Sequence, residues 1–336
     1  MPSIKRLKTE TELRKDQLDL VRLWREHQVK WNPNENGGRL RPDKNDVEEY
    51  HKRKRGHQGT GMYGSESAAF AEYMVLEALD AEGVLGKNWS LTEGHAYAYE
   101  PSDLDDILRG TDALMMYTGL DEEKERIVYP VAIDVTLDPD EAKVKQMRDM
   151  SRLTGNNPNL SRLYWYDTKS EEAGLSFDEP SEGKVRALNT TVYVPGELAD
   201  EFVSPNSNSH KAALALRRVG TLAVEQQRWQ LEAEALILTG GIRADRSGGM
   251  RFTVKDPTRY DVMRELGKLA KIGSEKMNDR TYAAKALLEV LPTIWMSVRN
   301  SILSREDEKY VARTRAVEGF HFLRGDYRTE EADAAE

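Results

Sequence analysis

The hydrophobic pattern changes period twice along this 336-residue chain, and that change limits the folds the chain can adopt. Residues 65–81 repeat apolar side chains at helical spacing, and Ser65 can cap their first turn. From residue 89 the pattern alternates as in strands, and from about residue 208 it returns to helical spacing. This order predicts an α+β fold, in which a sheet-containing core is followed by a helical region.

The alternating segment predicts a sheet built from short strands. The expected strands are residues 89–99, 112–117, 127–137, 162–168 and 184–195. Residues 100–111 and 118–126 should be turns between the first three strands. Residues 140–153 predict a helix, because Asp140 can cap it after the break at Asp138-Pro139. The chain order in this part is therefore α-β-β-β-α-β.

The C-terminal region predicts helices and no strand between residues 208 and 320. The expected helices are residues 209–239, 260–273, 279–302 and 306–318. Pro292 should kink or divide the third of them, because proline lacks the amide hydrogen that a helix interior needs. The glycine-containing segment 243–251 should be a loop.

Changes in composition divide the chain further. The predicted parts are a basic N-terminal helix and linker (1–63), an α/β core (64–205), an α-helical region (206–323) and an acidic tail (324–336). Residues 1–60 contain 15 Lys and Arg against 10 Asp and Glu, whereas the whole chain has a formal net charge of −9. Helices are expected at 9–30 and 44–54, and the run HKRKRG follows at 51–56. Such an arm is either a solvated leader or a weak contact for nucleic acid.

The composition excludes several classes of site. The chain has no cysteine, so disulfides, cysteine nucleophiles and cysteine-bound metals are excluded. No apolar run approaches the roughly 18 residues that a membrane-spanning helix needs. The N-terminus has no apolar segment typical of a secretory signal. We therefore expect a cytoplasmic protein with no membrane partner.

Two aspartates stand out in the strand region. Asp112 begins the second expected strand, and Asp134 lies within the apolar third strand. A carboxylate in such a strand is costly to bury unless it is paired, hydrogen-bonded or metal-bound. If the two strands form a hairpin, Asp112 can lie opposite Asp134, and this pair suits Mg²⁺. The alternative is structural: Asp134 lies on a solvated face, and Asp112 is a turn residue that accepts backbone hydrogen bonds.

The element order and these residues together resemble the PD-(D/E)XK nuclease superfamily, over about residues 65–195. That family carries an Asp at the start of its second strand, which matches Asp112. Its third strand carries an acidic residue, any residue and a lysine, which matches Asp134-Val135-Thr136 except that Thr136 replaces the lysine. The resemblance implies a restriction-endonuclease-like core.

The resemblance also implies roles for other residues. The family commonly has an acidic residue on its first helix, and here the choices are Glu77, which we prefer, and Glu72. Lys143 or Lys145 on the following helix would have to supply the missing ammonium group. By contrast, Asp103, Asp105 and Asp106 are expected to be loop or cap residues, and Arg109 a surface turn residue or a phosphate contact.

The implied function is Mg²⁺-dependent hydrolysis, or binding, of nucleic-acid phosphodiesters. Asp112 and Asp134 would bind the metal, and Glu77 would add a ligand or orient water. The alternative is an inactive nuclease-like protein that serves as a structural or adaptor component. In that case the helical C-terminal region would bind a protein partner.

Overall fold

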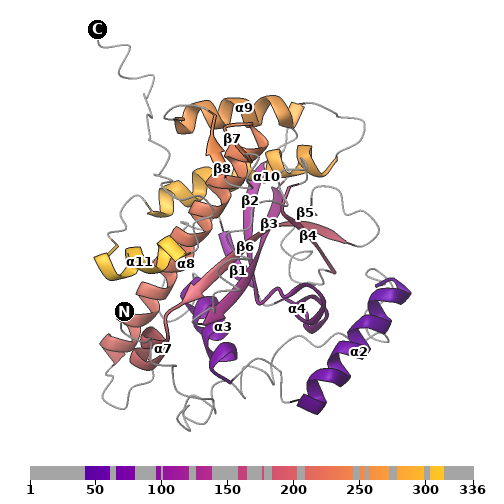
Figure 1. Cartoon of the computed structure of the whole chain (residues 1–336), viewed down its shortest axis with the longest axis vertical. Coiled ribbons are helices and arrows are strands. Elements are labelled where there is room, and N and C mark those ends of the chain that lie inside the picture. The colour runs from indigo at the N-terminus through magenta and orange to yellow at the C-terminus, as the bar shows by residue number, and fades with distance from the viewer. Residues whose placement is uncertain are drawn as a thin grey trace.

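The computed structural model is an α+β protein in which helices pack on a mixed β-sheet (Figure 1). The residues that the structure describes are 42–60, 66–79, 96–99, 101–120, 126–137, 158–164, 176–177, 184–202, 209–244, 250–253, 257–271, 278–298 and 303–313. The helices expected at 9–30 and 140–153 and the acidic tail lie outside the described residues.

The main sheet has the strand order β1-β2-β3-β6-β4, and the short β5 also pairs with β3. Its strands are β1 (Ala96–Tyr99), β2 (Ala113–Leu120), β3 (Arg126–Leu137), β4 (Leu160–Leu163), β5 (Ser176–Phe177) and β6 (Val185–Val194). Strands β1, β2 and β3 form an antiparallel meander. Strand β6 joins β3 in parallel, and β4 runs antiparallel along the other edge of β6. A parallel pair requires a crossover connection, and residues 138–184 provide it.

Helices pack against this sheet, mainly on one of its faces. They are α2 (Lys44–Thr60), α3 (Glu66–Leu79), α4 (Asp103–Arg109), α7 (Gly196–Phe202), α8 (Ser209–Leu238), α9 (Arg259–Lys271), α10 (Asp279–Val298) and α11 (Arg305–Arg313). Figure 1 shows the long α8 running beside the sheet, with α9 and α10 at one end and α2 and α4 at the other.

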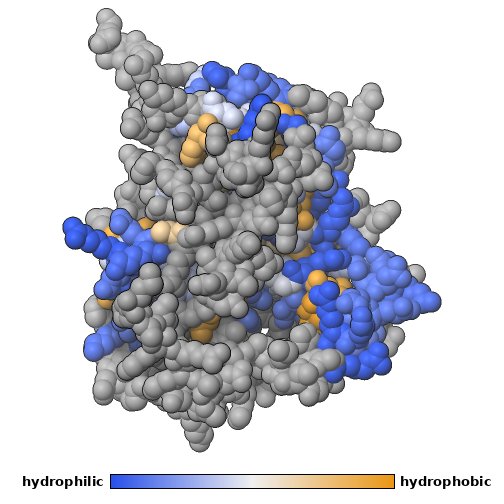
Figure 2. Space-filling view, viewed as in Figure 1, coloured by the Kyte–Doolittle hydropathy of each residue, from blue (hydrophilic) through white to orange (hydrophobic). Residues whose placement is uncertain are grey.

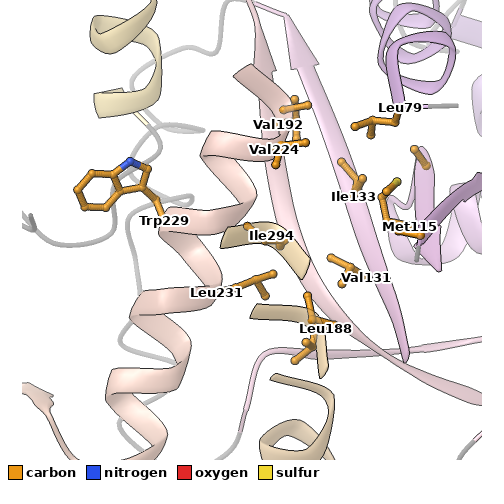
Figure 3. Packing of buried hydrophobic residues seen from close by; sticks show 14 of the residues in the cluster. Leu79, Met115, Val131, Ile133, Leu188, Val192, Val224, Trp229, Leu231 and Ile294 are labelled. Carbon is orange, nitrogen blue, oxygen red and sulfur yellow. The ribbon is translucent and has the colours of Figure 1, made fainter. Parts of the chain in front are cut away.

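One hydrophobic cluster unites the sheet with helices from both halves of the chain. Val131 and Ile133 of β3 point into it, and α3, α8 and α10 contribute side chains around them (Figure 3). The alternate residues of β3, such as Ala132, face a second hydrophobic cluster on the opposite side of the sheet. Burial of each large aliphatic side chain stabilises the fold by about 1.5–3 kcal/mol. The C-terminal helices therefore share the core with the strands.

Most of the expected elements are present among the described residues. Helix α3 and strands β1, β2, β3, β4 and β6 overlap the predicted segments, as do helices α8, α9, α10 and α11. The short helix expected at 44–54 is α2, which continues to Thr60. Pro292 lies inside α10, which is one uninterrupted helix by its hydrogen bonds, so this proline does not divide it.

Two expectations about irregular segments were wrong. The turn expected at 100–111 contains α4, which begins after the Ser102 cap and ends at Gly110 in the left-handed conformation (φ 64°). The loop expected at 243–251 contributes to a hairpin of β7 (Ile242–Ala244) and β8 (Met250–Phe252). Each of these elements is too short to show a periodic hydrophobic pattern, which is why the sequence predicted irregular structure.

Candidate functional site

The start of β2 brings Asp112 close to the β3 residues around Asp134. Ala113 at the start of β2 pairs with Ile133 of β3. The amide of Asp112 also donates to Ile133 O, at 2.9 Å, which is one residue out of that register, so the ladder does not continue to pair Asp112 with Asp134. The two aspartates are nevertheless near enough for the charge of Asp134 to act on Asp112.

The Asp112 carboxylate completes the end of the ladder. Strand β3 extends to Leu137, beyond the first residue of β2, so the amide of Val135 has no carbonyl of β2 opposite it. Asp112 Oδ2 accepts a hydrogen bond from Val135 N at 2.6 Å in place of that carbonyl. This bond is the structural role that the sequence analysis considered for Asp112. It also directs the carboxylate toward the strand that carries Asp134.

The environment of Asp112 is strongly acidic. Burial raises the pKa of Asp112 well above its usual range, and the charges of Glu72, Asp106 and Asp134 raise it further. The hydrogen bond from Val135 acts in the opposite direction but does not compensate. Like charges in a poorly solvated site disfavour ionisation in this way. Three carboxyl groups, from α3, α4 and β3, therefore act on the carboxyl group at the start of β2.

Helix α3 presents Glu72, rather than Glu77, to this cluster. Glu72 is the charge with the largest effect on Asp112. Glu77 instead interacts with the Tyr73 hydroxyl one turn earlier on the helix; burial and then the Glu77 charge raise the pKa of Tyr73 to about 12. Of the two glutamates, which are about 140° apart around the helix, Glu72 is therefore the one whose charge acts on Asp112.

The sequence analysis missed Asp106 as a member of the cluster. It lies on α4, whose acidic residues have different partners: Asp103 accepts hydrogen bonds from Tyr50 and Lys54, and Asp105 accepts one from the Tyr164 amide. The signal for this helix was present in the sequence, because a Ser cap, acidic residues in the first turn and a terminal glycine bracket it. A helix predicted from these signals would have placed Asp106 on α4 and not in an irregular loop.

The lysines that the family resemblance implies for this site lie outside the described residues. Thr136, in the place of the family lysine, is half-buried two residues after Asp134 on β3. Lys143 and Lys145 lie outside the described residues. Arg109, the other candidate phosphate contact, pairs with Asp46 of α2 at 2.9 Å. The structure therefore assigns Arg109 to the contact between α4 and α2.

The donor chemistry of the cluster suits a hard divalent cation. Carboxylate oxygens are the ligands that Mg²⁺ takes from proteins, and it usually needs only one or two of them beside water. Within the described part of the chain, however, no three His, Asp or Glu side chains form a ready-made metal-binding group. The fit to Mg²⁺ therefore rests on the mutual repulsion of the carboxylates, which a cation would relieve.

Comparisons with other proteins add no further assignment. No protein-family model, curated protein or solved structure matches this chain. Over the residues that the structure describes, no helix is both long enough and apolar enough to cross a membrane.

Proposed function

We propose that this protein is a Mg²⁺-dependent nuclease-like protein that hydrolyses phosphodiester bonds of nucleic acid. The observation that carries the proposal is the hydrogen bond from Val135 N to the Asp112 carboxylate, which holds this group against the strand of Asp134, while the charges of Glu72 and Asp134 both act on it. The strand order adds support, since α3 is followed by an antiparallel meander and then by β6 parallel to β3. The PD-(D/E)XK resemblance implies that arrangement for its α-β-β-β-α-β core.

The carboxylates have distinct tasks in this proposal. Asp112 and Asp134 hold the metal, and Glu72 takes the supporting role that the sequence assigned to Glu77. When bound, Mg²⁺ would lower the pKa of a water molecule and neutralise charge on the phosphodiester. Because Asp112 keeps its proton more tightly than an ordinary aspartate, cation binding should release a proton from it.

The ammonium group of the family motif has to come from elsewhere in the chain. Thr136 is uncharged and cannot stabilise developing negative charge as lysine does. We assign this task to Lys143 or Lys145, which follow β3 closely in the sequence. Replacing the correct lysine by alanine should abolish cleavage, and replacing the other should not.

Calorimetric titration with Mg²⁺ tests the metal site directly. The wild type should bind one ion or more and release protons, so the measured heat should depend on the ionisation enthalpy of the buffer. Asp134→Asn should lose most of this binding, while Glu77→Gln, on the same helix as Glu72 but beside Tyr73, should retain it. Equal binding by wild type and Asp134→Asn would reject the site.

A nuclease assay then tests the reaction. The proteins are wild type, Thr136→Lys, Lys143→Ala and Lys145→Ala, with Asp134→Asn as the inactive control. If a helix lysine already acts, Thr136→Lys should add nothing; if the site has lost its cation, Thr136→Lys should make Mg²⁺-dependent nicking measurable. The enzyme proposal fails if neither the wild type nor Thr136→Lys cleaves.

The second candidate function is that of an inactive nuclease-like adaptor. Thr136 favours it, and so do the exposed apolar side chains of the helical region, Tyr260 of α9 and Met296 of α10, which are 65% and 58% exposed. These side chains are suited to a protein partner. Retained Mg²⁺ binding without cleavage in any variant would favour this function over the enzyme.

A further inference from the structure

Helix α2 is fixed against α4 through one polar stripe of its surface. Asp46 pairs with Arg109 at 2.9 Å, and Lys54 pairs with Asp103 at 3.0 Å. Arg53 donates to the last carbonyls of α4. The contacts run along the whole of α4, so the two helices lie antiparallel, side by side (Figure 1). The position of α2 relative to the helix that carries Asp106 is therefore defined.

The opposite stripe of α2 is basic and borders a pocket. Its basic members are His51, Lys52 and Arg55, which are all exposed, as is Glu48 one turn before them. Lys52 also pairs with Glu49 at 3.4 Å, an exposed contact that a stronger anion can replace. The pocket has a volume of about 750 Å³, and its described lining is Glu48, His51, Lys52, Lys54 and Arg55. No acidic residue occurs between positions 50 and 56, and Figure 2 shows a hydrophilic surface over this helix. An anion with several charges suits such a lining.

We propose that this basic face of α2, formed by His51, Lys52 and Arg55, holds the phosphate backbone of the nucleic acid whose phosphodiester the carboxylate cluster receives. The identity of the partner rests on the proposed function. Helix α4 connects the two surfaces, because one of its sides binds α2 and its Asp106 acts on Asp112. A helix diameter of about 10 Å corresponds to roughly three phosphates along one strand, at about 3.4 Å each.

Other anionic partners fit this face less well. A membrane-binding helix needs large apolar side chains beside its basic ones, and the exposed positions 44, 45, 48, 51, 52 and 55 are all polar. An acidic peptide would present carboxylates, which arginine also binds through two parallel hydrogen bonds, so polyglutamate serves as the competing anion in the test below.

Fluorescence anisotropy with the full-length protein tests this inference. The probe is a labelled 20-nucleotide single-stranded DNA, with the matching RNA and duplex as further arms, measured in Mg²⁺ and in EDTA. The paired variants are K52A/R55A on α2 and R264A/K268A on α9, where the same two charges are removed from exposed side chains. Circular dichroism and thermal melting check that both variants fold.

The expected result is a loss specific to α2. K52A/R55A should weaken binding about tenfold or more at low salt, and the slope of log affinity against log salt should fall by about 1.4 for single strands, which is two phosphate contacts. R264A/K268A should leave both quantities unchanged. Equal losses in the two variants, an unchanged slope in K52A/R55A, or equal binding of polyglutamate would overturn the inference.

The outcome can be separated from that of the proposed function. Binding lost in K52A/R55A with no cleavage by any variant would support the α2 surface and reject the nuclease. Mg²⁺-dependent cleavage with binding unchanged in K52A/R55A would support the nuclease and reject the α2 surface.

Discussion

Gln226 of α8 binds both backbone polar groups of Tyr193 on β6. Its Oε1 accepts from Tyr193 N at 2.8 Å, and its Nε2 donates to Tyr193 O at 2.9 Å. One turn later, Gln230 makes the same pair of bonds with Thr191, at 2.9 and 2.7 Å. Strand β4 pairs only with Val185–Leu188 of β6, so the two amides continue the ladder along this edge. Helix α8 thus closes a strand edge that could otherwise pair with another chain.

Replacing the two glutamines should lower the free energy of unfolding by different amounts. Gln226→Ala leaves a buried amide and carbonyl of Tyr193 without partners, which should lower the free energy of unfolding by about 2–4 kcal/mol. Gln230→Ala should cost only about 1 kcal/mol, because Thr191 is half-buried and water can replace the side chain. Urea denaturation of both variants measures the difference. Equal costs would mean that the edge of β6 is solvated along its whole length.

The carboxylate cluster should lower stability in the absence of metal. Asp112→Asn keeps an acceptor for the Val135 amide and removes a group whose ionisation is disfavoured by burial and by the charges of Glu72 and Asp134. Relief of one such repulsion is worth about 1 kcal/mol, so this variant should unfold at higher urea than the wild type in EDTA.

Asp112→Ala is the matched control for that measurement. It removes the same ionisable group but also leaves the Val135 amide without its acceptor, at a cost of about 1–3 kcal/mol. In EDTA, Asp112→Asn should be more stable than the wild type, and the wild type should be at least as stable as Asp112→Ala. An Asn variant less stable than the wild type would show that the other three carboxyl groups do not disfavour the ionisation of Asp112. Both variants should lose Mg²⁺ binding.

Two buried carboxyl groups hold the ends of β4 and should make stability depend on pH. Asp105 accepts from the amide of Tyr164 after the strand, and Glu234 accepts from the amide of Asn159 before it. Burial raises the pKa of each to about 7, against the effect of these hydrogen bonds. The unfolded values lie near 4, so between pH 4 and 7 the folded state binds more protons than the unfolded state.

The sign of the expected change follows from this difference. The contribution of Asp105 and Glu234 to stability is complete below about pH 4 and is lost as the pH rises toward 7. The free energy of unfolding should fall by about 2 kcal/mol per group between pH 5 and 7. Urea unfolding at pH 5, 6, 7 and 8 measures it, and the double variant Asp105→Asn/Glu234→Gln should have a flatter profile. Parallel profiles for wild type and variant would refute these pKa values as the origin of the pH dependence.

The sequence predicted the long elements because they depend on local pattern. Strands β2 and β3 alternate over enough residues to predict their hairpin, which sets the start of β2 beside the middle of β3. The offset bond from the Asp112 amide to Ile133 O has no signal in that alternation. The rotation of α3, which selects Glu72, depends on its packing against the sheet and α8 and has no local signal. Helix α4 has fewer than two full turns, so only its caps could reveal it.

The role of α8 could not be predicted for a different reason. Gln226 and Gln230 bond to strand residues 33 and 39 positions away in the chain, and a helical pattern does not indicate that its polar residues complete a sheet. The sequence pattern therefore predicted a boundary at residue 206 between the α/β core and the helical region. The main hydrophobic cluster includes residues from both sides of that boundary.

The contact between α2 and the rest of the protein includes a polar network that is centred on Asp46, beside the apolar contacts of Tyr50. Arg109, Lys184 and the Tyr164 hydroxyl all bind this carboxylate. Burial alone would raise the pKa of Asp46, but these partners lower it overall. The stabilisation that Asp46 provides is therefore present above its unfolded pKa near 4 and is lost as the pH falls through the lower folded value.

Asp46→Asn should therefore release α2 without unfolding the sheet. Hydrogen exchange of α2 amides should become about tenfold faster, equivalent to about 1.4 kcal/mol of lost docking, while exchange in β3 and β6 stays unchanged. Glu48→Gln is the control, since Glu48 lies on the exposed side and pairs only loosely with Lys44 at 3.8 Å. If both variants exchange like the wild type, the apolar contacts of Tyr50 with Leu104 and Leu108 hold α2 by themselves. If only Asp46→Asn exchanges faster, the basic face of α2 keeps its place through ionic contacts that high salt should weaken as well.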